Sequence, residues 1–254
     1  MAKGRTTINA PITHAWNQGI YKSLRILLHL IGAVQFIYAI YYDHVYVHHP
    51  HPDNDKNNYS FGGKFRFLTF LDAIIQAVYF VICLGNDFIG TNEVAPKKMP
   101  AIRKIKDYIL AALAFPIALN VGISFWTLYA IDRELVFPKV LDAIFPGWLN
   151  HILHTNIVVF IVLEMFTSFR TYPKRINGLT GLIAFMLSYL IWVHVIKHFS
   201  GVWVYPVLEV LELPQRIVFF GAILVFTVFL YLFGETINKI VWAKELKLAQ
   251  RKVK

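Results

Sequence analysis

The sequence has few charged residues for its length, and this scarcity excludes an ordinary soluble domain. Charged residues make up 16% of the 254 positions, against about 25% in soluble globular proteins. Apolar residues make up 57%, and the mean hydropathy is +0.52. A chain of this composition is typical of a protein that is solvated by lipid.

Cysteine and the common catalytic motifs are also scarce. Cys83 is the only cysteine, so no intrachain disulfide can form and cysteine usage does not indicate the redox compartment. The sequence contains no Gly-x-Ser-x-Gly elbow, no His-Glu-x-x-His, no Walker loop and no Gly-x-Gly-x-x-Gly. Absence of the elbow excludes an ordinary α/β-hydrolase, but it does not exclude a hydrolase that works inside a membrane.

Long apolar runs are what the sequence has in abundance. A helix needs about 20 apolar residues to cross a bilayer, because its backbone polar groups must be satisfied internally. Six runs reach this length, so we predict an all-α, polytopic membrane protein of about six transmembrane helices in one domain over residues 1–254. The first run is too long for a signal-peptide core and no cleavage site follows it, so we expect a retained helix. The expected helices cover about 23–42, 67–86, 108–130, 149–167, 178–197 and 217–240.

Basic residues are distributed unevenly among the segments between these runs. A net charge of +10 and a pI near 9.6 would suit nucleic acid as a partner. Lys and Arg lie in short segments between the long apolar runs, however, and this placement is typical of residues that set the orientation of a membrane protein. Nucleic-acid binding is therefore excluded. Of the 25 Lys and Arg residues, 18 lie in the leader, the second and fourth loops and the tail, and 7 lie in the other loops. The positive-inside rule therefore predicts that both termini are cytoplasmic, and the even number of helices agrees.

Polar residues at the ends of apolar runs are candidates for function, because ionisable groups are costly in lipid. Thr69 and Asp72 open the second run, and His151 and His154 open the fourth run at the same predicted boundary. A hydroxyl and an imidazole at one depth can form a nucleophile and its base. A structural interpretation stays open. Thr69 and Asp72 fit a helix capping box, and the two histidines can hydrogen-bond across helices.

A metal site, as in membrane lipid desaturases and hydroxylases, is an alternative use for the histidines. Imidazoles three or four positions apart on a helix can share a metal ion. The sequence lacks the two further His-x-x-His-His boxes of those enzymes, and its histidines fall on the predicted non-cytoplasmic side, whereas those boxes face the cytoplasm. Proline and aspartate neighbours favour a solvated loop for residues 44–51. The candidate ligands are His44, His48, His49, His151, His154, His194 and His198.

Several motifs occur in order along the chain, and in combination they are far more specific than any one alone. They are Phe67-Leu-Thr69-Phe-Leu-Asp72 with Gln76-Ala-Val, Leu113-Ala-Phe-Pro116, Asp132-Arg-Glu-Leu135, Trp148-Leu-Asn-His151-x-x-His154-Thr155, Ser200-Gly-Val-Trp-Val-Tyr-Pro206 and Leu232-x-Gly-Glu235. The chain from about Phe61 to Trp242 thereby resembles the androgen-induced protein family, which includes the androgen-dependent regulator of tissue factor pathway inhibitor.

The resemblance implies an integral membrane carboxylic ester hydrolase. Its substrates would be fatty acid esters of hydroxy fatty acids, which it would cleave to a fatty acid and a hydroxy fatty acid. The resemblance implies Thr69 as nucleophile and His154 as base, with no metal or organic cofactor. Asp72 lies one helical turn from Thr69, and His151 stands in the same motif as His154, so both are further candidates for shaping the site.

Two other functions and two locations stay open on the sequence. The chain could be a non-enzymatic membrane regulator or lipid-binding protein, or the histidine-ligated lipid oxidase described above. We expect a multi-pass protein of the plasma membrane or of the endoplasmic reticulum and other endomembranes. The tail ends Arg251-Lys-Val-Lys254, which resembles a dibasic retrieval signal for the endoplasmic reticulum.

Overall fold

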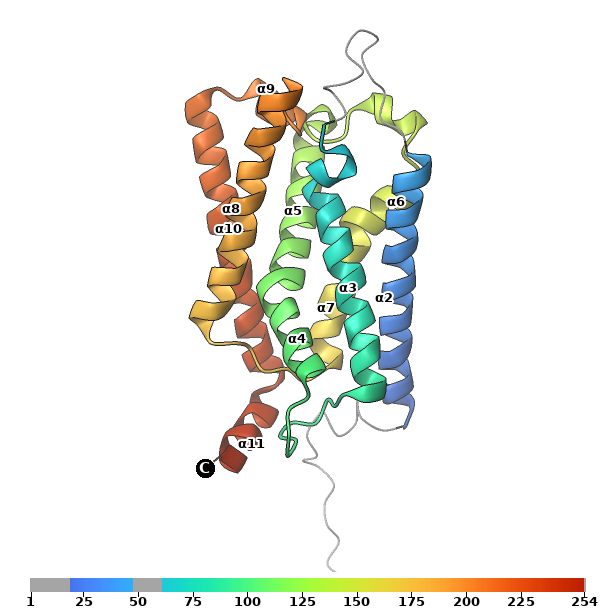
Figure 1. Cartoon of the computed structure of the whole chain (residues 1–254), viewed down its shortest axis with the longest axis vertical. Coiled ribbons are helices and arrows are strands. Elements are labelled where there is room, and N and C mark those ends of the chain that lie inside the picture. The colour runs from blue at the N-terminus through green and yellow to red at the C-terminus, as the bar shows by residue number, and fades with distance from the viewer. Residues whose placement is uncertain (1–18, 48–60, 254) are drawn as a thin grey trace, which may run out of the picture.

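The computed structural model describes residues 19–47 and 61–253 as a bundle of long helices (Figure 1). Six of the described helices are long and apolar enough to cross a membrane, as the sequence predicts. They are α2 (Gly19–Tyr46), α3 (Leu68–Ile89), α4–α5 (Ala101–Leu135), α6–α7 (Gly147–Thr167), α8 (Arg175–Ser200) and α10 (Leu213–Val241). Shorter helices are η1 (Gly63–Arg66), η3 (Arg133–Leu135), η4 (Lys139–Ala143), α9 (Pro206–Val210) and α11 (Ala243–Val253).

Two of the membrane-length helices pass through a π-helical turn. Such turns interrupt the regular hydrogen-bond ladder of a helix and are frequent at functional sites. The first joins α4 (Ala101–Ile109) to α5 (Phe115–Asp132) through Leu110–Ala114, and the second joins α6 (Gly147–His151) to α7 (Ile157–Thr167) through Ile152–Asn156.

The third spanning helix departs most from its predicted bounds. We expected it to begin near residue 108, but it begins at Ala101, and Arg103 and Lys106 are buried in the helix instead of lying in a loop. Asp107 explains the difference, because its carboxylate accepts from Arg103 Nε at 3.0 Å and lies 3.4 Å from Lys106 Nζ. Hydropathy treats each charge as unpaired, so it ends the apolar run too early.

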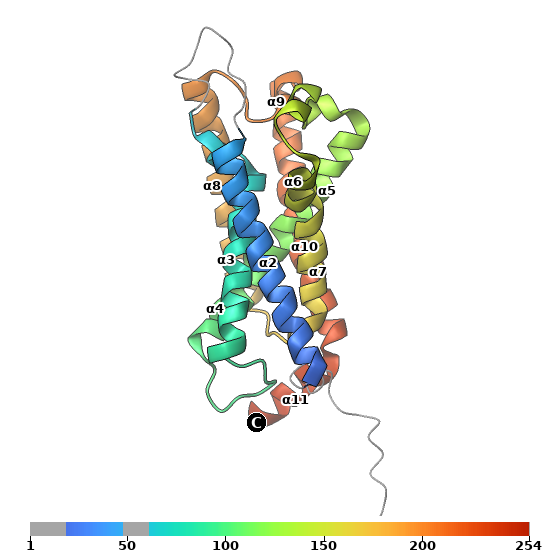
Figure 2. The same ribbon diagram turned by 90° about the vertical axis from the view of Figure 1, so that its right-hand side faces the viewer.

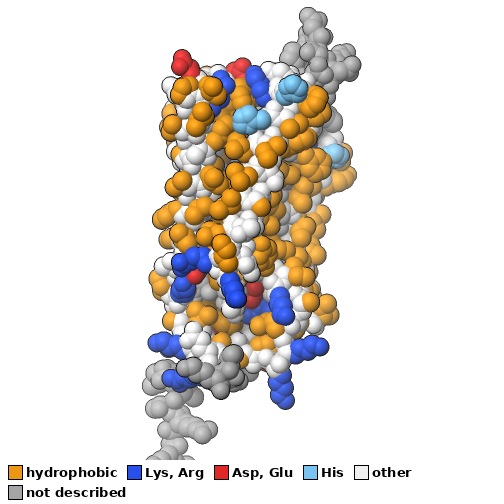
Figure 3. Space-filling model, turned by 60° about the vertical axis from the view of Figure 1, so that its left-hand side comes forward, with side chains coloured by type: hydrophobic (Ala, Val, Ile, Leu, Met, Phe, Trp, Pro, Cys, Tyr) orange, Lys and Arg blue, Asp and Glu red, His pale blue; other side chains and the backbone are white. Residues whose placement is uncertain are grey.

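The outer surface of the bundle is apolar. Figure 3 shows hydrophobic side chains in a continuous band, with Lys and Arg side chains gathered mainly toward the end that carries the C-terminus. On α10, for example, Ile217, Val218 and Val225 are each more than 60% exposed. A surface of this kind is stable in hydrocarbon, so the chain is a multi-pass membrane protein.

The ion pairs that close one end of the bundle are buried between α2, α3 and α7. Arg25 Nε and His29 Nδ1 contact the carboxylate of Asp87 at 3.0 and 2.6 Å. His29 Nε2 lies 2.9 Å from Glu164 Oε2, and Arg170 donates to Glu164 Oε1 at 3.2 Å. Because carboxylates only accept, both ring nitrogens of His29 donate, so this histidine is an imidazolium. The network closes the end of the bundle opposite Thr69.

The N-terminal end of α2 and the C-terminal helix α11 lie at the same end of the bundle (Figures 1 and 2). This end also carries the buried ion pairs. The arrangement follows from six crossings, and it agrees with termini on one side of the membrane. That this side is the cytoplasm stays a prediction from the Lys and Arg distribution.

Candidate active site

Thr69 lies in the first turn of α3, at the end of the bundle opposite the buried ion pairs. The helix begins at Leu68, and its N-cap is Phe67 in an extended conformation (φ −91°, ψ 127°). Thr69 is therefore the second residue of the helix, and the capping-box interpretation of Thr69 and Asp72 is wrong. Two tyrosine hydroxyls from distant segments accept from the N–H of Leu68, so the helix start is stabilised by tertiary contacts that local sequence does not reveal.

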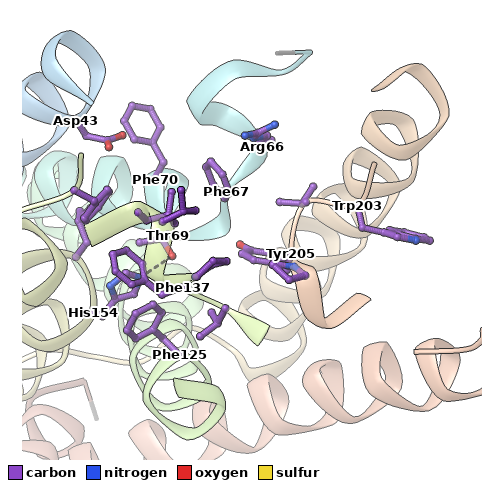
Figure 4. Close-up of a pocket in the computed structure, with 18 of the residues that line it drawn as sticks. Asp43, Arg66, Phe67, Thr69, Phe70, Phe125, Phe137, His154, Trp203 and Tyr205 are labelled. Atoms are coloured by element: carbon purple, nitrogen blue, oxygen red, sulfur yellow. Dashed lines mark hydrogen bonds between the residues drawn. The ribbon is translucent and has the colours of Figure 1, made fainter. Parts of the chain in front are cut away.

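His154 lies in the π turn between α6 and α7, and its ring is buried. Its Nδ1 lies 3.0 Å from the backbone oxygen of Asn150 and 2.7 Å from the side-chain oxygen. A carbonyl oxygen only accepts, so Nδ1 carries the hydrogen and Nε2 of the neutral ring keeps its lone pair. Nε2 lies 3.2 Å from Thr69 Oγ1 (Figure 4). The ring stacks on Phe125, with 3.5 Å between the centroids and an 11° interplanar angle.

A glycine on α5 allows α7 to approach closely enough for this geometry. A Cβ atom at Gly122 would lie 2.8 Å from the carbonyl oxygen of His154 and would overlap the side chain of Val158. Phe125 follows Gly122 by three positions, on the same side of α5, and stacks on the imidazole. The contact between α5 and α7 therefore sets both the position and the plane of the His154 ring.

Asp72 and His151, the two further candidates, make their hydrogen bonds to residues other than Thr69 and His154 in the described part of the chain. Asp72 is fully buried, and its Oδ1 accepts from Gln76 Nε2 at 2.8 Å. The same Gln76 nitrogen donates to the carbonyl oxygen of Ala114, so Asp72 belongs to a link between α3 and the first π turn. His151 is exposed and stacks on Trp126, with 5.5 Å between the ring centroids. Neither residue lines the cavities beside Thr69.

Two cavities meet at Thr69. The first has a volume of about 510 Å³ and opens toward the segments before α3 and around α9; its lining includes His154 and the charged residues Asp43, Arg66 and Glu209. The second has a volume of about 430 Å³ and lies among α5, α8 and α10, with a mostly apolar lining. Four residues line both cavities, and they mark the junction: Thr69, Phe125, Val136 and Tyr205.

The described histidines among the candidate metal ligands do not form one cluster. Among the described residues, the one group of three side chains with metal-ligand spacing is His29, Cys83 and Glu164, at the opposite end of the bundle. Both nitrogens of His29 already contact carboxylates there, and the buried ammonium of Lys106 raises the local positive charge. His194 lines the second cavity, and its Nδ1 donates to a backbone carbonyl. His48 and His49 lie outside the described residues.

Comparison with known proteins assigns the chain to a family. Residues 24–239 match the FAR-17a/AIG1-like proteins. The chain belongs to this family. It is 41% identical to the androgen-induced gene 1 protein of Homo sapiens, over 77% of this chain and 84% of that protein. It is 38% identical to the androgen-dependent TFPI-regulating protein of Mus musculus (75% and 83% covered) and 35% identical to that of Rattus norvegicus (91% and 99%).

These matches confirm the resemblance to the androgen-induced protein family that the motifs indicate. The names of the relatives describe androgen induction and TFPI regulation, and they specify no reaction. No solved structure matches the chain.

Sequence reasoning missed three residues that build the site, which are Asn150, Phe125 and Tyr205. Asn150 precedes His154 by four positions, so helical spacing already places the two side chains on one face. Tyr205 stands in the Ser200–Pro206 motif, but nothing in that segment shows which residue its hydroxyl contacts. The stacking of Phe125 on His154 depends on how α5 and α7 pack, and no local signal indicates it.

Proposed function

We propose that this protein is a membrane hydrolase of lipid carboxylic esters, with fatty acid esters of hydroxy fatty acids as substrates. Thr69 is the nucleophile and His154 is its base. The observation that carries the proposal is the 3.2 Å contact from Thr69 Oγ1 to His154 Nε2 at the junction of two cavities. A base within hydrogen-bond reach, itself oriented by a third group, is the usual arrangement of an activated hydroxyl.

The reaction follows from this geometry. Nε2 of His154 takes the proton of Thr69 while Oγ1 bonds to the ester carbonyl carbon, and the carbonyl electron pair moves to oxygen. When the carbonyl re-forms, the bond to the alcohol oxygen breaks and His154 protonates the leaving hydroxy fatty acid. Water, deprotonated by His154, then attacks the acyl-threonine; the bond from the acyl carbon to Thr69 Oγ1 breaks, His154 returns the proton to Oγ1, and the fatty acid leaves. Asn150 stays hydrogen-bonded to Nδ1 throughout and stabilises the imidazolium that forms.

The pair of cavities supports this class of substrate. An ester of a hydroxy fatty acid carries two hydrocarbon chains that diverge from the ester group, and two cavities diverge from Thr69. We assign the apolar cavity among α5, α8 and α10 to the acyl chain. The other cavity has charged residues on its lining, including Arg66, and takes the hydroxy acid, which ends in a carboxylate.

The position of the site along the bundle supports entry from the membrane. Thr69 lies one residue inside the start of α3, near the boundary that the Lys and Arg distribution places on the non-cytoplasmic side. An amphiphilic ester would keep its chains among the helices and its ester group at this boundary. Residence in the plasma membrane or the endoplasmic reticulum is consistent with such a substrate.

Substitution of the two residues tests the proposal. Thr69→Val keeps the side-chain shape without a nucleophile and abolishes hydrolysis and covalent labelling by a fluorophosphonate, whereas Thr69→Ser keeps part of both. His154→Ala is as inactive as Thr69→Val, and the double variant is hardly worse, because the two residues act as a unit. The assay is hydrolysis of a fatty acid ester of a hydroxy fatty acid by detergent-purified protein that elutes as a single peak. Wild-type turnover by folded Thr69→Val contradicts the mechanism.

A second function is favoured by the relatives named for TFPI regulation. In a non-enzymatic regulator, the two cavities would hold a lipid without converting it. This alternative expects lipid binding and cellular function to survive Thr69→Val, and it expects no labelling of Thr69 by the fluorophosphonate. The same variant therefore separates the two functions.

A further inference from the structure

Tyr205 brings a phenol hydroxyl from the far end of the chain to the residue next to the nucleophile. It is the N-cap of α9, and its Oη lies 2.9 Å from the backbone nitrogen of Leu68, the residue before Thr69. In Figure 4 this hydroxyl points from the α9 segment toward Thr69. The mechanism proposed above makes no use of this hydroxyl.

A count of hydrogens shows that the hydroxyl of Tyr205 is available as a donor. Each tyrosine hydroxyl carries one hydrogen. Tyr189 donates its hydrogen to the carbonyl oxygen of Arg66 at 2.9 Å, and both phenol oxygens accept from the N–H of Leu68. Within the described part of the chain, the hydrogen of Tyr205 has one acceptor, Tyr189 Oη at 3.1 Å. A stronger acceptor in the cavity can capture this hydrogen without leaving any group unsatisfied.

Tyr205 also lines the junction of the two cavities, where the ester group of a bound lipid would lie. Thr69 and Tyr205 are the two residues with a polar side chain that line both cavities. A lipid with one chain in each cavity places its ester group between them. Burial raises the pKa of Tyr205, so its hydroxyl stays protonated at the pH of the cell.

We propose that Tyr205 is a catalytic residue that donates a hydrogen bond to the oxyanion of the tetrahedral intermediate. The inference rests on the hydrolase function proposed above. When Thr69 Oγ1 bonds to the carbonyl carbon, the π electron pair moves to oxygen, and the O–H of Tyr205 turns from Tyr189 to this oxygen. The proton stays on Tyr205. When the pair returns and the alcohol leaves, the hydrogen bond returns to Tyr189.

The start of α3 adds to the same effect. Thr69 is the second residue of this helix of 22 residues, where the helix dipole is positive, and the N–H groups of Leu68, Phe70 and Leu71 already have acceptors. Negative charge on a carbonyl bonded to Oγ1 therefore develops beside both a phenol hydroxyl and a helix N-terminus. The phenol oxygen of Tyr205 is held by its contacts with Leu68 and Tyr189, so only the O–H bond has to rotate as the charge develops. Donors that need little reorganisation usually contribute a large part of catalysis in acyl transfer.

Matched removal of the two hydroxyls tests the proposal. Tyr205→Phe and Tyr189→Phe each delete one hydroxyl that caps Leu68, so a purely structural role gives similar losses. We expect kcat to fall about 10²–10³-fold in Tyr205→Phe with KM changed only a few-fold, because one oxyanion donor is lost. Tyr189→Phe loses less than about tenfold in kcat. A Tyr205→Phe enzyme with more than a tenth of wild-type kcat, or one that falls no further than Tyr189→Phe, overturns the proposal.

A second measurement decides the matter if Tyr205→Phe does not fold. Incorporation of 3,5-difluorotyrosine at position 205 keeps the shape of the side chain but makes its hydroxyl more acidic. A donor must stay protonated, so the alkaline limb of the kcat profile moves to lower pH, while the same replacement at Tyr189 leaves the limb in place. An alkaline limb that does not move at position 205 overturns the proposal.

The Thr69→Val variant separates failure of this inference from failure of the proposed function. An inactive Thr69→Val together with a fully active Tyr205→Phe leaves the hydrolase standing and removes only the role of Tyr205. An active Thr69→Val removes both.

Discussion

Replacing Gly122 with alanine tests whether the close approach of α5 and α7 sets the catalytic geometry. The new Cβ would lie 2.8 Å from the carbonyl oxygen of His154, whereas ordinary van der Waals contact begins at 3.4 Å. The π turn must therefore shift by about 0.6 Å to relieve the overlap. This shift displaces His154 relative to Thr69, and the 3.2 Å separation of Nε2 and Oγ1 is already at the long end of the hydrogen-bond range.

Two opposing terms set the expected effect of Gly122→Ala on stability. Overpacking costs about 1–3 kcal/mol, and the higher helix propensity of alanine offsets about 1 kcal/mol. The net loss is therefore small, and the protein stays folded. Activity responds more strongly, because a displacement of about 1 Å costs about 10²-fold in rate. We expect kcat to fall about tenfold or more while Tm changes by only a few degrees.

Gly147→Ala is the matched control. Gly147 begins α6, and no atom lies within 4 Å of a Cβ placed there, so the same substitution adds the same methyl group without overlap. Both variants are assayed for ester hydrolysis, fluorophosphonate labelling and Tm in detergent. A Gly122→Ala protein with wild-type kcat would refute the argument that contact between α5 and α7 positions the histidine.

Three further predictions concern the base, the buried ion pairs and the topology. Asn150→Ala lowers kcat about tenfold, because the backbone carbonyl of residue 150 still accepts from Nδ1 of His154 and keeps the hydrogen there. Loss of the orienting carboxylate of a serine triad costs far more, about 10⁴-fold. An unchanged kcat contradicts this prediction. Glu164→Gln destabilises the protein by about 3–5 kcal/mol, since it leaves His29 and Arg170 short of a buried partner. The folded fraction of Glu164→Gln keeps wild-type kcat, because Glu164 lies about 15 Å along the helix from His154. A wild-type Tm for Glu164→Gln contradicts the predicted loss of stability. Epitope tags at both termini stain only after permeabilisation of sealed cells, and a tag that stains before it, on protein at the cell surface, contradicts cytoplasmic termini.

The broad architecture was predictable because its causes are local and additive along the chain. Membrane crossing depends on the apolar content of about 20 consecutive residues, so the six spans can be recognised in the sequence. Because six is an even number, the sequence also predicts that both ends of the chain lie on the same side of the membrane. The depth of Thr69 and His154 follows from the same count, which made their meeting a reasonable prediction. The exception is the helix that begins at Ala101, where a buried partner of Arg103 cancels the cost that hydropathy assigns.

The site itself was decided by tertiary structure. Local sequence was compatible with Thr69 as the N-cap of a helix. In the structure the helix begins one residue earlier, at Leu68, whose N–H donates to two tyrosine hydroxyls, and the Thr69 hydroxyl contacts His154 instead of capping the helix. The tautomer of His154, the stacking on Phe125 and the meeting of two cavities all depend on how helices rotate and how closely they pack. The sequence by itself determined which residues reach one depth of the membrane; only packing decided which of them touch, because a contact between helices depends on both partners at once.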